Sequence, residues 1–235
     1  MTRGLFEFEN IGHHSLKGIK EPQQVWRVIK EKSISSRFVA HAAELTPMVD
    51  RRDTLQTLID GWHEAAARRA QVVLLVGEPG VGKSRVVEEM SDIISLQSEH
   101  HHPQYQCSPY HANTALYPVV ARLRTAAGIE QGDPPELQLE KLEALVRNSS
   151  PDIEADMPAF VELLSLPAAR WQAPNLDPEA KKEWILTTLI ENLLSLSESR
   201  PVLVTIEDIH WIDPTTLDLL ERIIDAISGH AIFLV

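Results

Sequence analysis

The chain of 235 residues has little cysteine and lacks a long apolar segment. Its single cysteine, Cys107, cannot form an internal disulfide, which excludes a disulfide-stabilised scaffold and fits a reducing compartment. No apolar run approaches the roughly 18 residues of a membrane-spanning helix. The first residues also lack the pattern of a secretory signal peptide. We therefore expect a cytoplasmic protein with no membrane partner.

Positive charge is also scarce. The sequence has 22 lysines and arginines and 34 aspartates and glutamates, which gives a net charge of −12. An acidic surface does not attract phosphate backbones, so the composition argues against a general nucleic-acid binder. No helix-turn-helix candidate with a basic face is found, which argues against a DNA-binding regulator. The 43 % of hydrophobic residues is enough for a packed core.

The most informative segment is residues 77–84, Gly-Glu-Pro-Gly-Val-Gly-Lys-Ser, directly after the apolar run 72–76. A buried strand that runs into G-x-x-x-x-G-K-[ST] predicts a phosphate-binding P-loop. The alternative is a glycine-rich turn that only joins a strand to a helix. Such a turn has no need of a final Lys-Ser pair.

Each residue type in this motif has a role in binding ATP with Mg²⁺. The glycines allow a positive φ and bring bare N–H groups against phosphate oxygens. Lys83 would reach the β- and γ-phosphates, and the hydroxyl of Ser84 would hold the Mg²⁺ ion. The predicted nucleotide-binding residues of the loop are Gly77, Glu78, Pro79, Gly80, Val81, Gly82, Lys83, Ser84 and Arg85.

A second candidate is the acidic pair Glu207-Asp208, which follows the apolar run 202–206 and has the form of a Walker B motif. We assign Glu207 to the Mg²⁺ ion and Asp208 to the orientation or deprotonation of an attacking water. The alternative is a pair of surface acids at a strand end. Nearby, Asp213 is expected to cap a helix and Trp211 to serve in packing.

The order of elements predicts an α/β fold. Strands are expected at 72–76, 104–107, 202–206 and 231–235, and helices at 52–69, from Lys83, and at 116–127, 135–147, 158–164, 178–197 and 214–228. Such alternation predicts a mostly parallel sheet flanked by helices, with ligands at the carboxyl ends of the strands. Residues 5–9 and 24–29 are expected to form a separate strand pair, and the His100–His102 triplet a solvated loop.

Four segments together resemble a known family. These are LTPMVDR at 45–51, GEPGVGKSR at 77–85, QCSPYHANTALYPV at 106–119 and VTIEDIHWIDPTTLDLL at 204–220. They are similar to the AAA/STAND-type P-loop ATPase module of bacterial signalling proteins. Those proteins also carry a class III adenylate/guanylate cyclase domain and tetratricopeptide-like helical repeats. Residues 8–29 resemble the last strands of such a cyclase domain.

The resemblance implies three parts: a cyclase remnant at 1–30, a linker at 31–46 and an ATPase domain at 47–235. It places Val49 and Arg51 near the adenine base, although Asp50 replaces the family's glycine. The Glu207-Asp208 order also reverses the family's Asp-Glu order. No cyclase activity is expected, because the metal-binding aspartates of a cyclase are not among these residues.

In the family, the strand matching 231–235 is followed by a sensor residue, a fifth strand and a helical lid. We therefore expect a fragment whose strand 72–76 has an open apolar edge, and hence self-association. The resulting hypothesis is a Mg–ATP-binding regulatory switch with slow or no hydrolysis, whose partners are neighbouring cyclase and helical-repeat domains. The alternatives are a competent ATPase that uses Asp208, and a remnant that binds no nucleotide.

Overall fold

The computed structural model describes residues 6–19, 21–31, 51–167 and 170–235. The chain divides into two compact units, Met1–Val49 and Asp50–Val235. The predicted linker lies outside the described residues apart from Glu31, and so does the predicted site residue Val49. Within the described part of the chain, no helix is both long enough and apolar enough to cross a bilayer.

The first unit contains an antiparallel hairpin of β1 (Phe6–His14) and β2 (Gln23–Glu31). The expected strand pair is thus present, and both strands are longer than predicted. A bulge falls between Asn10 and Gly12, where Gly12 has a φ of 88° and its N–H donates to the Asn10 side chain. Trp26 and Val28 are about half exposed on this hairpin.

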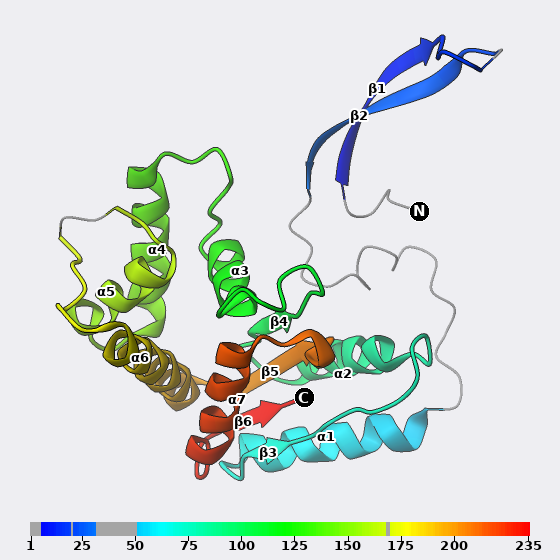
Figure 1. Cartoon of the computed structure of the whole chain (residues 1–235). Helices are drawn as coiled ribbons and strands as arrows, with labels where there is room; N and C mark the ends of the chain where they lie inside the picture. The colour runs from blue at the N-terminus through cyan, green and yellow to red at the C-terminus, as the bar shows by residue number, and fades with distance from the viewer. Residues whose placement is uncertain (1–5, 20, 32–50, 168–169) are drawn as a thin grey trace. The chain divides into compact units, whose positions relative to one another are not determined.

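The second unit is built on a parallel sheet of four strands in the order β3-β6-β5-β4 (Figure 1). The strands are β3 (Gln71–Val72), β4 (Gln104–Gln106), β5 (Val202–Glu207) and β6 (Ile232–Leu234). The predicted α/β class and the parallel sheet are confirmed. Because β5 and β6 are central, their apolar residues are buried on both faces.

Helices cover both faces of this sheet (Figure 1). They are α1 (Arg52–Ala66), α2 (Lys83–Gln97), α3 (Tyr117–Ala126), α4 (Pro135–Ser149), α5 (Ile153–Leu163), α6 (Pro178–Ser199) and α7 (Pro214–Ala226). On one face, α1 approaches β6 at Gly61, where an added Cβ would meet the Phe233 ring at 3.1 Å. On the other face, Leu193 of α6 and Leu220 of α7 pack against the sheet.

The strand before the P-loop is shorter than predicted. Only Gln71 and Val72 pair with β6, and the Val73 N–H then donates to the carbonyl of Leu234 at 2.8 Å. Beyond Val73, no backbone hydrogen bond to another described residue holds the chain until the loop. The side chain of Val76 is accordingly 83 % exposed. The predicted buried strand over 72–76 is therefore wrong in its second half, while its expected position at an open edge is confirmed.

Two smaller predictions are also wrong. The His100–His102 triplet is not a solvated loop, because His101 forms a parallel bridge with Val202 and so extends the pairing of β4 with β5. The Nε2 atom of His102 lies 3.2 Å from the hydroxyl of Thr205. Trp211 does not pack in the interior: it lies in the 3-10 turn Ile209–Trp211 and is 42 % exposed.

Candidate functional site

The candidate site lies where the strands end. The chain leaves β3 toward the loop 77–82, and β5 ends at Glu207. Its neighbour β4 ends at Gln106, which is in register with Glu207. Because all these strands are parallel, their carboxyl ends meet at one edge of the sheet, which is the usual ligand site in this class of fold.

The loop has the backbone that the motif predicts. Gly80 and Gly82 have φ values of 79° and 94°, which a residue with a Cβ rarely adopts. Gly82 is the N-cap of α2, so the free N–H groups of that helix point toward the loop. The ammonium of Lys83 donates to the carbonyls of Gly77 at 2.7 Å and Glu78 at 3.1 Å. The lysine thus folds back over the loop.

The remaining predicted loop residues lie around this turn. Glu78, Pro79 and Gly80 are exposed, and Arg85 is half-buried in the first turn of α2. Arg51, at the start of α1, donates from its guanidinium to the carbonyl of Val81 at 3.0 Å. The structure therefore brings Arg51 to the P-loop across 30 residues of sequence.

Ser84 and Glu207 meet between α2 and β5. The Ser84 hydroxyl lies near enough to the Glu207 carboxylate to lower its pKa. Burial raises the pKa of Glu207, the Ser84 hydrogen bond opposes that rise, and the charges of Asp208 and Glu88 add to it. A cation beside this carboxylate would favour its charged form, because opposite charge offsets the cost of burial.

Asp208 turns away from this contact toward the neighbouring strand. It has a φ of 56°, in the left-handed region, and its Oδ2 accepts a hydrogen bond of 2.9 Å from Nε2 of Gln106. The Oε1 of Gln106 is buried and has no hydrogen-bond partner among the described residues. The sequence reasoning did not select Gln106. Its position at the end of a predicted strand was the available signal.

Asp213 is the helix cap that the sequence predicts. It is 1 % exposed, and its Oδ1 accepts from the backbone N–H groups of Thr215 and Thr216 at the start of α7. The same oxygen also accepts from the N–H of Leu116, the N-cap of α3, which has a φ of 56°. One carboxylate therefore ties the starts of two helices together.

Residues 47–235 match the family model described as "AAA ATPase domain". The chain belongs to this family. The AAA ATPase domain covers the whole described part of the second unit, including the P-loop and the Glu207-Asp208 pair. It is a P-loop module, and the parallel sheet flanked by helices agrees with it.

One relative matches nearly the whole chain. It is an uncharacterized protein, R02095, of Rhizobium meliloti (strain 1021), with 30 % identity over 227 residues. The match covers 95 % of this chain and 22 % of the relative, so the chain spans about a fifth of that protein's length. No solved structure matches the chain.

The AAA ATPase domain has donors that suit a magnesium ion. Within the described ranges, no group of three or more His, Cys, Asp or Glu side chains could form an all-protein metal site. Ser84 and Glu207 instead place one hydroxyl and one carboxylate together. Mg²⁺ is commonly held by one or two protein oxygens and completed by phosphate and water, so this pair fits it.

Proposed function

We propose that this chain binds Mg–ATP through residues 77–85 and acts as a nucleotide-dependent regulatory switch, with slow or no hydrolysis. The observation that carries the proposal is a P-loop with Lys83 folded over it, beside which Glu207 lies near enough to Ser84 for the hydroxyl to lower its pKa. The loop would bind the phosphates with its N–H groups and with the positive end of the α2 dipole.

Lys83 is the residue that would respond to the nucleotide. Its ammonium now donates to two backbone carbonyls of the loop. A phosphate oxygen is a stronger partner for a cation than a neutral carbonyl, because the hydrogen bond is then charged at both ends. Binding of ATP would therefore move the Lys83 ammonium from the carbonyls of Gly77 and Glu78 to the β- and γ-phosphates.

Ser84 and Glu207 would hold the metal, which when bound neutralises charge on the phosphates. Arg51, already on the loop at Val81, and Val49 would lie near the adenine base, as the family resemblance implies. ATP is favoured over GTP on the same resemblance.

The two candidate functions, a switch and an efficient enzyme, differ in how well Asp208 acts on the attacking water. In the proposed function it orients or deprotonates water poorly, because it is bonded to Gln106 and stands where the family has a longer glutamate. The alternative is a competent ATPase in which Asp208 performs this step. Rapid steady-state hydrolysis by the chain would favour that alternative.

The switch would act on neighbouring domains of a longer protein. The similarity of residues 8–29 to the end of a cyclase domain supports a cyclase-type neighbour, and the same family supports helical repeats. Self-association is proposed from the exposed edge at β3, where Val76 is unpaired within the described residues.

The test is thermal unfolding of the full chain with and without Mg–ATP. A ligand at a hundred times its dissociation constant stabilises the folded state by about 2.7 kcal/mol, a rise of roughly 5 to 10 °C in Tm for a domain of this size. Lys83→Ala should abolish this rise. Lys182→Ala, which removes a lysine that pairs with Asp218 on α7, should keep it.

The other outcomes are equally informative. The same rise in Lys83→Ala would show that ATP does not bind at the P-loop. A cooperative transition without any ATP-dependent rise would support the remnant that binds no nucleotide.

A further inference from the structure

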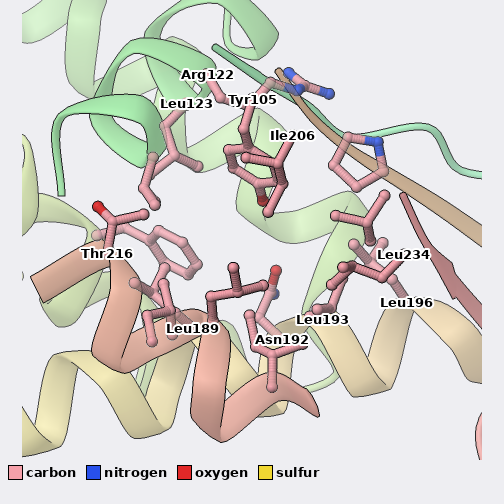
Figure 2. Close-up of a pocket in the computed structure, with 17 residues that line it drawn as sticks. Tyr105, Arg122, Leu123, Leu189, Asn192, Leu193, Leu196, Ile206, Thr216 and Leu234 are labelled. Carbon is pink, nitrogen blue, oxygen red and sulfur yellow. The ribbon is translucent and has the colours of Figure 1, made fainter. Parts of the chain in front are cut away.

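A cavity separate from the P-loop lies inside the second unit. It is lined by one face of the sheet and by α3, α6 and α7 (Figure 2). Phe160 of α5 also contributes to its wall. Its volume is about 90 Å³, which is room for roughly six to nine water-sized groups. Most of its wall is aliphatic, with Leu189, Leu193, Val204, Ile206 and Leu220 among the lining residues.

Polar groups interrupt this apolar wall. Tyr105 and Asn192 reach into the cavity from opposite sides (Figure 2). The Tyr105 hydroxyl has no hydrogen-bond partner within the described part of the chain, and burial raises its pKa. The amide nitrogen of Asn192 donates a 3.3 Å hydrogen bond to the backbone carbonyl of Ser149. A donor that faces an apolar space without a partner costs free energy, so an oxygen acceptor there would be stabilising.

The third polar group is a cation. Arg122 of α3 lies beside Tyr105 at the edge of the cavity (Figure 2), and its charge opposes the rise in the pKa of Tyr105. It is half-buried, and among the described residues it forms no ion pair and no hydrogen bond. Most arginines of this unit are satisfied by acids or carbonyls; Arg124, two residues away, bonds Gln138 and Leu164. A half-buried cation without an acid partner would be stabilised by a bound anion, because burial of a charge costs free energy unless the charge is paired.

We infer that this cavity binds a medium-chain hydroxy carboxylic acid. The aliphatic chain lies against the leucine, valine and isoleucine walls, the carboxylate pairs with Arg122, and the hydroxyl oxygen accepts a hydrogen bond from Tyr105. An eight-carbon acid has seven carbons besides its carboxylate carbon. This number lies within the roughly six to nine water-sized groups for which the cavity has room. The site uses no residue of the P-loop, so it is independent of the proposed nucleotide binding.

The test is calorimetric titration of the full chain with 3-hydroxyoctanoate and with octanoate. Both acids should bind with one-to-one stoichiometry, the hydroxy acid more tightly. Arg122→Gln should weaken both acids by about ten- to a hundredfold, because a charged hydrogen bond is lost. Tyr105→Phe, which removes one oxygen and keeps the ring, should weaken only the hydroxy acid, to the level of octanoate.

Arg147→Gln is the matched control. Arg147 lies on α4, pairs with Glu143 and does not line the cavity, so its loss should leave both affinities unchanged. Leu189→Phe fills the space with an apolar ring and should abolish binding while a thermal transition remains. Absence of one-to-one binding overturns the inference, and so does binding that is equally strong in Arg122→Gln. Equal affinity of the two acids in the wild-type chain overturns the role of Tyr105.

Discussion

The Nε2 atom of Gln106 donates a 2.9 Å hydrogen bond to Oδ2 of Asp208, so the end of β4 holds the acid that follows β5. If Asp208 acts on the attacking water, Asp208→Asn should lower ATP turnover by about a hundredfold or more, because a general base is lost. Nucleotide affinity should stay within about twofold. Gln106→Leu keeps the acid and should change turnover by less than about tenfold.

The control for this pair is Asp225→Asn, which alters an exposed aspartate on α7. Turnover is measured as released phosphate, and affinity is measured separately by calorimetry. Unchanged turnover in Asp208→Asn would remove the assignment of this residue. An equal loss in Gln106→Leu would mean that the amide, and not only the acid, is required.

Ser84→Ala tests the proposed metal ligand. The wild-type chain should bind ATP more tightly with Mg²⁺ than with a chelator, and loss of the hydroxyl should reduce that difference by about tenfold. Ser91→Ala is a matched control on the same helix, because among the described residues the Ser91 hydroxyl bonds the carbonyl of Val87 alone. The measurement is calorimetric titration of ATP with and without Mg²⁺. A full magnesium effect in Ser84→Ala would contradict the assignment.

Asp213→Ala should destabilise the fold strongly. The variant leaves three backbone N–H groups and the Thr216 hydroxyl without their buried acceptor, at a cost of about 3 kcal/mol or more. Asp177→Ala removes a comparable cap at the start of α6, but an exposed one, and should cost about 1 kcal/mol. Urea unfolding monitored by circular dichroism measures both. Equal losses would show that the link from Asp213 to Leu116 adds no stability.

We expect His102 to make the stability of the fold sensitive to acid. Burial, together with the charges of His100 and Arg122, lowers the pKa of His102 from 6.5 to about 4. Below pH 6.5 the unfolded chain therefore binds a proton that the folded chain does not, so stability falls as the pH falls toward 4. Between pH 7 and pH 5 this residue should cost about 2 kcal/mol of unfolding free energy.

The variant His102→Gln should lose this part of the pH dependence. It keeps a polar side chain opposite Thr205 but has no titrating ring. Urea unfolding at pH 7 and pH 5 compares the two chains, so that acid effects from carboxylates cancel. The same decrease in stability in both chains would show that His102 is not the group responsible.

Local patterns predicted the parts of the site that are contiguous in sequence. The loop 77–84 needs its glycines and Lys83 within one turn, and Asp213 caps residues only two and three positions away. Such features depend on neighbouring residues, so the sequence displays them directly. The prediction of a strand over 72–76 was wrong in its second half because it depended on a distant segment. An apolar run does not show how far the partner strand extends.

Sequence patterns alone are enough to predict the α/β class, the P-loop with its Lys-Ser ending, and the acidic pair after a buried strand. Three relationships become visible in the folded chain: Gln106 bonds Asp208 across 102 residues, Arg51 reaches Val81, and Tyr105 and Arg122 border an apolar cavity. These contacts could not be predicted because hydrophobic periodicity indicates only which residues are buried. It does not state which strands lie side by side, and that order places distant side chains in contact.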